Sequence, residues 1–306
     1  MGTEWQLELH STQSPVSLRS IAEAVVEEVE RVEQQLSFYR ETSDLRSLNA
    51  TAAYEDTAVD PRLFSLLGRV QTLSRATGGA IDPTVGPLLR CWGFVGGSGS
   101  MPIAEEIEAA RRVVGMEHVI LTPGQNTVRF DREGIELEFG AVGKGYAIER
   151  AVDMLRDEYE IESALLHGGT STIYGLGAPP GEDAWNVAIR RPNSATGETV
   201  LTLPLRDRAV SVSAPHGKWF EQEGNRYGHV LDPRTGNPAV GSVIAVVATA
   251  TAMESDALST ALLVMGETGM ATVRALRQDA FVLVGIWEES GELRVAQDGP
   301  LSAGNL

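Results

Sequence analysis

The segment MESDALSTALLVMG, from Met253 to Gly266, places two oxygen-bearing side chains in a sequence that otherwise predicts an apolar helix. Asp256 and Thr260 are four residues apart, so on a helix they would lie one above the other on the same face. A carboxylate and a hydroxyl in this arrangement could bind Mg²⁺, which prefers oxygen ligands and usually takes one or two carboxylates. The spacing therefore indicates a candidate metal site.

The same residues also have a purely structural interpretation. Thr251 and Glu254 match a capping box, which predicts a helix start near Ala252. Asp256 would then lie near the first turn, where a negative charge interacts favourably with the helix dipole. Thr260 could donate a hydrogen bond to the carbonyl oxygen of Asp256, as mid-helix threonines often do. The segment alone is consistent with both interpretations.

A second candidate is the segment EFGAVGKGYAIE, from Glu138 to Glu149, which predicts a strand, a glycine-rich turn and a helix. Backbone N–H groups at a helix N-terminus bind anions, and glycines let a phosphate approach closely. The segment is not a Walker A loop, because Glu138 and Gly145 stand where that motif needs Gly and Ser or Thr. It predicts either a phosphate-binding turn or a glycine-rich connection that carries a surface lysine, Lys144.

Three further segments combine polar residues with turn residues. HGGTS, from His167 to Ser171, is interpreted as a tight turn, because the chain has no GxSxG nucleophile motif. HVLDPRTG, from His229 to Gly236, places a histidine before turn-forming residues, and alone it is consistent with a structural histidine. TGGAIDPTVGPLLRCWGF, from Thr77 to Phe94, could be a buried connection or the wall of a pocket for a flat ligand.

Composition limits the function classes. The chain has 306 residues and a net charge of −17, from 42 acidic and 25 basic residues, which opposes binding to nucleic acid and anionic membranes. An anionic substrate would therefore need a local basic group or a metal. The only cysteine, Cys91, excludes an internal disulfide and a Cys-based zinc site, and its apolar neighbours predict a buried side chain.

The expected location is the cytoplasm for the chain as given. Its N-terminus has neither the basic nor the apolar region of a signal peptide, it contains no lipobox, and no apolar run reaches the ~18 residues of a membrane span. An exported form is expected only if a leader was removed.

Hydrophobic periodicity predicts alternating groups of helices and strands. Helices are expected over 21–36, after Asp60-Pro61 to Gly78, from Pro102 to Gly115, over 143–157, from about Ala252, and over 271–276. Strands are expected over 5–10, 118–121, 127–131, 135–139, 163–167, 185–189, 199–203, 209–213, 242–249 and 281–286. Because strict βαβ alternation is missing, the fold class is expected to be α+β. The strand-poor first half and the strand-rich second half could be subdomains.

Six segments, in order, resemble the ApbE family of FAD:protein FMN transferases, and the resemblance covers nearly the whole chain. They are MGTEW (1–5), LSFYRETSDLRSLN (36–49), TGGAIDPTVGPLLRCWGF, EFGAVGKGYAIE, HVLDPRTGNP and SDALSTALLVMG. The resemblance implies one ApbE-like domain over residues 1–306. Its implied fold has mixed, T-fold-like sheets flanked by helices and a FAD cleft between two subdomain halves.

The resemblance also implies an activity. It implies binding of FAD and Mg²⁺ and transfer of FMN to a Thr or Ser hydroxyl of a target flavoprotein, with AMP leaving. Some family members hydrolyse FAD to FMN and AMP, so an FAD pyrophosphatase that depends on Mg²⁺ is the alternative enzyme. An inactive FAD-binding or carrier protein is the alternative outside the enzymes.

Individual residues carry over from the family motifs. The resemblance implies that the carbonyl of Ala141 binds the metal together with Asp256 and Thr260, and that His229 is the base. The implied FAD contacts are Met1, Tyr39, Ala80, Ile81, Asp82, Glu138 and Lys144. The chain departs from the family at SVSAPHGKW, from Ser211 to Trp219, where a T-S-G-x-Y run is usual. This departure adds His216 and Lys218, and it affects target recognition or the flavin wall.

Overall fold

The computed structural model describes residues 2–194, 196–215 and 217–300, and it contains two compact units. The first unit comprises Met1–Glu33, Val142–Ala214 and Ser242–Leu306, and the second comprises Gln34–Ala141 and Pro215–Gly241. Each unit is therefore assembled from segments that are distant in sequence. The units do not follow the expected division into two sequence halves, and the single domain over residues 1–306 stays a prediction.

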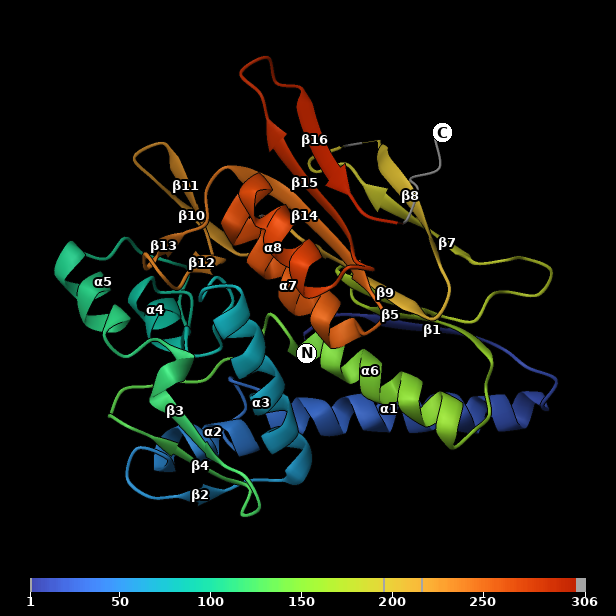
Figure 1. Ribbon diagram of the computed structural model, residues 1–306, viewed down its shortest axis with the longest axis horizontal. Coiled ribbons are helices and arrows are strands. Elements are labelled where there is room, and N and C mark those ends of the chain that lie inside the picture. The colour runs from blue at the N-terminus through green and yellow to red at the C-terminus, as the bar shows by residue number, and fades with distance from the viewer. Residues whose placement is uncertain (1, 195, 216, 301–306) are drawn as a thin grey trace. The chain divides into compact units, whose positions relative to one another are not determined.

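The first unit is built on a seven-stranded sheet with the order β1-β5-β6-β9-β14-β15-β16 (Figure 1). All neighbouring strands in it are antiparallel. The strands are β1 (Trp5–His10), β5 (Ser163–Gly168), β6 (Thr172–Leu176), β9 (Arg208–Ser213), β14 (Ser242–Thr249), β15 (Phe281–Trp287) and β16 (Leu293–Asp298). The expected strands of this sheet are confirmed, whereas β6 and β16 were not predicted.

Both faces of this sheet are covered. Helices α1 (Pro15–Leu36), α6 (Gly143–Asp157) and α7 (Ala252–Met265) pack on one face, where Ile21, Ile148 and Leu166 share a cluster. The hairpin of β7 (Trp185–Arg190) and β8 (Thr199–Leu205) packs with the other face, around Leu203 and Val246. Cover on both faces explains why β14 is an almost continuous apolar run rather than an alternating one. The last helix of this unit is α8 (Gly269–Leu276).

Helices α6 and α7 approach each other closely at Gly145. A Cβ atom at this position would lie 2.2 Å from the carbonyl oxygen of Ala252 and 2.8 Å from the Cβ of Asp256. Real Cβ atoms do not approach so closely, so this crossing requires glycine. The approach brings the Gly145 N–H within 2.9 Å of the Asp256 carboxylate. The packing of two helices thus positions a predicted site residue.

The described residues of the second unit form four α-helices, a 3-10 helix (Met116–His118), a small sheet and two hairpins. The helices are α2 (Asp44–Thr51), α3 (Pro61–Ala76), α4 (Gly86–Cys91) and α5 (Ala104–Arg111). The sheet has the order β2 (Thr57–Ala58), β4 (Thr127–Phe130) and β3 (Val119–Thr122), and the hairpins are β10 (Trp219–Gln222) with β11 (Asn225–Gly228) and β12 (Leu231–Asp232) with β13 (Asn237–Pro238). As predicted, Asp60 caps α3 by accepting a hydrogen bond from the N–H of Arg62, and Pro61 opens the helix.

The expected strand over residues 135–139 is wrong. This segment makes one isolated bridge, between Glu136 and Val85. Beside it, the Asn49 side chain bonds both backbone groups of Leu137, at 2.8 Å to its N–H and 2.9 Å to its carbonyl. Because a distant side chain satisfies these backbone groups, the segment is held extended without a ladder. The helix after Pro102 also ends earlier than expected, at Arg111 rather than Gly115.

The expected capping box at the start of α7 is also wrong. Thr251 is the N-cap residue, but its side chain makes no capping bond and its buried hydroxyl has no hydrogen-bond partner in the described structure. Glu254 pairs with Arg277 instead, at 2.5 Å and 2.6 Å. A charge-assisted bidentate pair is stronger than a bond to a neutral N–H, which accounts for the choice.

The α+β fold class is confirmed by these elements. Within the part of the chain that the structure describes, no helix is both long and apolar enough to cross a membrane.

The close approach at Gly145 yields a stability prediction. We expect Gly145→Ala to lower the free energy of unfolding by about 1–3 kcal/mol, because a methyl group must be forced between packed backbones. Gly143→Ala is the matched control in the same helix, since a Cβ there has no neighbour within 4 Å. Urea unfolding of both variants measures the difference. Equal stability of the two would show that α6 and α7 do not cross as described.

Candidate functional site

Asp256 lies in α7 with only 3% of its surface exposed, and its carboxylate contacts two other elements. Its Oδ1 accepts a hydrogen bond from the Thr172 hydroxyl in β6 at 3.1 Å, and its Oδ2 accepts one from the N–H of Gly145 at 2.9 Å. The ammonium of Lys144 lies 3.6 Å from Oδ2. A buried carboxylate is costly unless it is paired and hydrogen-bonded, and these contacts supply both conditions.

Lys144 and Gly145 belong to the first turn of α6, where backbone N–H groups lack partners within the helix. The expected glycine-rich turn into a helix is therefore confirmed. However, the Gly145 N–H already bonds Asp256, so a carboxylate from α7 occupies part of this helix terminus. The anion that this turn binds within the structure is a side chain of the protein itself.

A cluster of hydroxyl groups extends from Asp256 along α7. The hydroxyl cluster consists of Thr172, Ser211, Ser213, Ser259 and Thr260. Ser211 donates to Thr172 at 3.1 Å, and the Ser213 hydroxyl lies 2.9 Å from that of Ser259 and 3.1 Å from that of Thr260. Ser211 and Ser213 were not predicted. Their signal is the i, i+2 spacing of serines on one face of β9, among buried valines.

The hydroxyl of Thr260 also donates to the carbonyl oxygen of Asp256, at 3.3 Å. This bond is the one that the structural interpretation of the segment expects. It does not use the Asp256 carboxylate, which still has acceptor capacity, since a carboxylate offers about four lone-pair sites. The described residues contain no group of three or more His, Cys, Asp or Glu side chains that could hold a metal. The donors here are oxygens, which suit a hard cation.

In the second unit, His229 follows β11 and is held by the backbone of Lys218. The His229 N–H donates to the Lys218 carbonyl at 2.9 Å. The ring Nδ1 lies 3.1 Å from that carbonyl and 3.2 Å from the Lys218 N–H. A Cβ at Gly217 would lie 2.6 Å from the His229 Cε1, so glycine permits this approach. Nδ1 therefore faces the peptide groups of Lys218.

Aromatic side chains support the hairpin that carries His229. Phe220 and Tyr227 stack across it at 5.2 Å, and Trp92 lies 5.7 Å from Tyr227. Phe94 lies 5.8 Å from Phe220 and 6.5 Å from the His229 ring. These rings come from the predicted TGGAIDPTVGPLLRCWGF segment and from the hairpin, so the segment supports the position of the histidine.

The start of the same segment forms a tight turn after α3. Asp82 is buried, and its carboxylate accepts from the Ser74 hydroxyl at 2.9 Å, the Met116 N–H at 3.0 Å, and the N–H and hydroxyl of Thr84 at 2.9 Å and 2.5 Å. Ala80 and Ile81 are buried as well. Asp82 therefore fixes the turn, and any contact of this segment with FAD depends on that anchoring.

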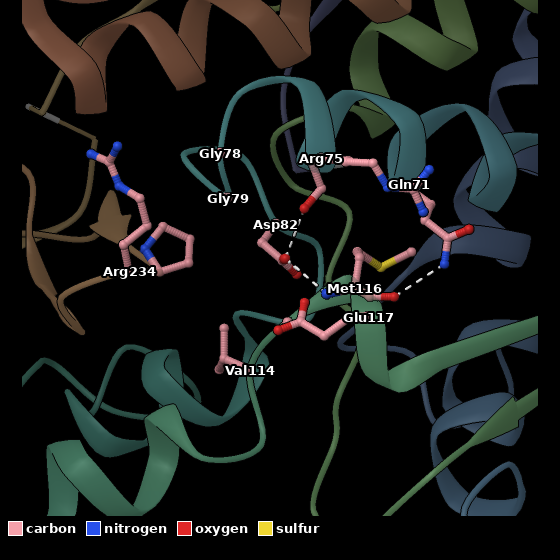
Figure 2. A pocket seen from close by; sticks show the side chains of 12 residues that line it. Gln71, Arg75, Gly78, Gly79, Asp82, Val114, Met116, Glu117 and Arg234 are labelled. Carbon is pink, nitrogen blue, oxygen red and sulfur yellow. Dashed lines mark hydrogen bonds between the residues drawn. The ribbon is translucent and has the colours of Figure 1, made fainter.

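A pocket of about 380 Å³ lies beside this turn (Figure 2). Its lining residues are Gln71, Ser74, Arg75, Gly78, Gly79, Asp82, Val114, Gly115, Met116, Glu117, Pro233 and Arg234. Of the predicted FAD contacts, only Asp82 lines it. Sequence reasoning missed Arg75, Glu117 and Arg234 because the fold brings them from three separate segments.

Comparison with known proteins identifies the family. The model of the ApbE family matches residues 1–283. A FAD:protein FMN transferase from Vibrio cholerae serotype O1 is 30% identical over 292 residues, which cover 93% of this chain and 85% of the relative. The chain belongs to the ApbE family.

Solved structures of ApbE proteins agree with this assignment. The ApbE protein from Thermotoga maritima has a TM-score of 0.85 at 30% identity, with 96% of this chain and 93% of that chain covered. The flavinyl transferase ApbE from Pseudomonas stutzeri, in its apo form, has a TM-score of 0.84 at 28% identity, with 97% and 92% covered. The expected ApbE family and fold are confirmed, and the names of these relatives support the expected transferase class.

Within this ApbE chain, the structure brings together Lys144, Asp256 and Thr260 of the predicted site residues. Glu138 accepts a bond from the Gly140 N–H at 2.8 Å, and its FAD contact stays a prediction. Ala141 belongs to the second unit, and its role as a metal ligand also stays a prediction. Met1 lies outside the described residues.

Two other ApbE site expectations concern exposed or reactive groups. Tyr39 is 61% exposed, as a ligand-contacting ring can be. Cys91 is half-buried rather than buried, and burial, followed by the negative charge of Glu106, raises the pKa of its thiol. A raised thiol pKa lowers the thiolate fraction, so this site does not activate Cys91 as a nucleophile.

The buried bond between Thr172 and Asp256 yields the second prediction. We expect Thr172→Val to lower the free energy of unfolding by about 1–3 kcal/mol, because it removes a donor from a buried carboxylate and an acceptor from Ser211. Thr172→Ser keeps the hydroxyl and is the matched control. Guanidinium unfolding of the pair tests this, and a Thr172→Val protein as stable as Thr172→Ser would contradict it.

Proposed function

We propose that this ApbE protein transfers FMN from FAD to a Thr or Ser hydroxyl of a target flavoprotein, in the presence of Mg²⁺, with AMP as the leaving group. The observation that carries the proposal is the buried carboxylate of Asp256, which faces both the Lys144 ammonium and the oxygen-rich hydroxyl cluster. Family membership and the names of the relatives support the transfer of FMN.

The donor chemistry at Asp256 fits Mg²⁺. The cation commonly binds one or two carboxylates and completes its shell with water and substrate phosphates. Asp256 and Thr260 would hold it, with the Ala141 carbonyl as the further ligand that the family implies. When bound, the cation neutralises charge on the pyrophosphate and on the departing AMP. Lys144 contributes a second positive charge to the same phosphates.

His229 is the proposed general base. Its imidazole would accept the proton of the attacking hydroxyl, with Nδ1 oriented by the Lys218 backbone. The oxygen of that hydroxyl then bonds to the flavin-side phosphorus, and the bond from this phosphorus to the bridging oxygen breaks. FMN is thereby joined to the acceptor through a phosphodiester, and AMP takes the bridging oxygen.

Exposed aromatic side chains favour a protein acceptor over water. Tyr39 is 61% exposed and Trp219 is 44% exposed, and both are neighbours of Lys218, in space or in sequence. A docked acceptor protein would cover these rings.

One assay tests the function. The protein is incubated with FAD and Mg²⁺, with and without a flavoprotein that the Vibrio cholerae relative modifies. We expect AMP release and a mass increase of the acceptor by one FMN unit only when FAD and the acceptor are both present. AMP without acceptor would instead establish the FAD pyrophosphatase, and bound FAD without AMP would establish a carrier protein.

Asp256→Ala tests the metal assignment. We expect it to reduce AMP release by roughly 10³-fold or more, because the only carboxylate proposed to hold the cation is lost. Thr260→Ala should be milder, since water can replace a neutral hydroxyl ligand. AMP release is measured against Mg²⁺ concentration for both variants. Wild-type rates from Asp256→Ala at low Mg²⁺ would show that Asp256 is not a ligand.

His229→Gln tests the base. We expect kcat to fall by roughly 10²–10⁴-fold, the usual contribution of a positioned general base, with little change in the KM for FAD. Both proteins are assayed side by side at neutral pH with saturating FAD and acceptor. His10→Gln is the control, because His10 lies on β1 and pairs with Glu8. A wild-type kcat in His229→Gln would remove His229 from the mechanism.

A further inference from the structure

The chain has two lysines, Lys144 and Lys218, and all of its other basic residues except histidine are arginines. Lys144 contacts Asp256. Lys218 lies in the segment that departs from the family pattern, and its ammonium lies 5.2 Å from the centre of the Tyr39 ring. Both lysines thus contact a residue of the proposed site.

The Lys218 ammonium has no carboxylate partner among the residues that the structure describes, despite the 42 acidic residues of the chain. Arginines of the same region are paired: Arg226 lies 3.7 Å from Glu221, and Arg234 lies 2.8 Å from Asp232. An exposed cation over an aromatic face is held only weakly. The ammonium is therefore held by a weak contact that an anionic ligand can readily replace.

The backbone of the same residue holds the proposed base. The Lys218 carbonyl accepts the His229 N–H and lies 3.1 Å from the ring Nδ1. The base must act on a hydroxyl that attacks the flavin-side phosphorus of FAD. The Lys218 side chain thus starts from the peptide that positions this base.

We propose that the Lys218 ammonium binds the flavin-side phosphate of FAD, which makes Lys218 a substrate-binding residue of this chain. This proposal rests on the proposed function. The ligand chemistry follows from the cation, because an ammonium is a compact, strongly hydrated point charge that suits phosphate oxygens. FAD also brings a doubly charged pyrophosphate to a protein of net charge −17, so local cations must supply the attraction.

Ligand binding to Lys218→Met separates the phosphate from the flavin ring. The probes are FMN, which has the flavin-side phosphate, and riboflavin, which has only the ring and its side chain. We expect Lys218→Met to weaken FMN and FAD binding roughly tenfold or more, the usual effect of losing a charged hydrogen bond, and to leave riboflavin binding unchanged. Lys218→Arg should lose less, because it keeps the charge but not the geometry.

Arg226→Met is the matched control for these measurements. Arg226 is an exposed cation on the same hairpin and lies over the Trp219 ring at 4.5 Å. The Arg226→Met protein should bind FMN and riboflavin with the affinities of the wild type. Equal losses of FMN and riboflavin binding in Lys218→Met would assign Lys218 to the aromatic wall and overturn the proposal, as would unchanged FMN binding.

The scarcity of lysine provides a readout on the unmodified protein. Acetylation followed by peptide mass spectrometry reports on Lys144 and Lys218 separately. We expect FMN, but not riboflavin, to protect Lys218 from acetylation, and a lack of protection at saturating FMN would contradict the proposal. Both experiments measure binding alone. FMN protection without AMP release would sink the proposed function and keep this inference, whereas FMN transfer by a fully active Lys218→Met protein would do the reverse.

Discussion

The buried carboxylate of Asp256 is the interaction on which the functional elements of the first unit depend. It joins three elements at once, because α7 supplies the carboxylate, α6 supplies the Gly145 N–H and Lys144, and β6 supplies Thr172. Each donor left unsatisfied in a buried position would cost about 1–3 kcal/mol. The carboxylate is thus a structural anchor in its own right, and this role persists whether or not a cation is bound.

A structural and a chemical role are compatible on one carboxylate. The negative charge at the start of α6 suits the helix dipole, and the remaining lone pairs can face a hard cation. The two interpretations of the Asp256 segment are therefore not exclusive. The Thr260 hydroxyl donates to the backbone carbonyl of Asp256, and this hydrogen bond does not involve the Asp256 carboxylate. The second unit shows the same economy, since the Lys218 peptide that completes a hairpin also orients the His229 ring.

The sequence predicted those parts of the structure that depend on local patterns. Helix α6 and strand β14 begin and end where periodicity places them, and Asp60 caps α3 as its residue type indicates. The failures arise where a distant partner decides. The Asn49 side chain bonds the backbone N–H and carbonyl of Leu137, so these groups need no partner strand. Glu254 pairs with Arg277 instead of capping α7. No periodicity within a segment can reveal a partner 88 residues away.

The site shows the same division between residue identity and arrangement. Sequence motifs indicated Asp256, Thr260 and Lys144 as site residues. They did not indicate that position 145 must be glycine for α6 to approach α7. The hydroxyl cluster escaped prediction because serine and threonine are common in strands and helices of every kind. Only tertiary structure shows that Ser211 bonds Thr172, which donates to the buried carboxylate, and that Ser213 bonds Thr260.

The overall charge of the chain also has to be reconciled with an anionic substrate. At physiological ionic strength charges are screened beyond about 8 Å, so most of the 42 acidic residues act weakly on a bound pyrophosphate. Cations close to the pyrophosphate are screened much less, but a salt bridge to a carboxylate weakens their attraction for it. Arg90, Arg156 and Arg277 lie in salt bridges with carboxylates, and Lys144 pairs with Asp256, whereas the Lys218 ammonium lies over an aromatic face. For so acidic a protein to bind FAD as proposed, the placement of nearby cations matters more than the net charge.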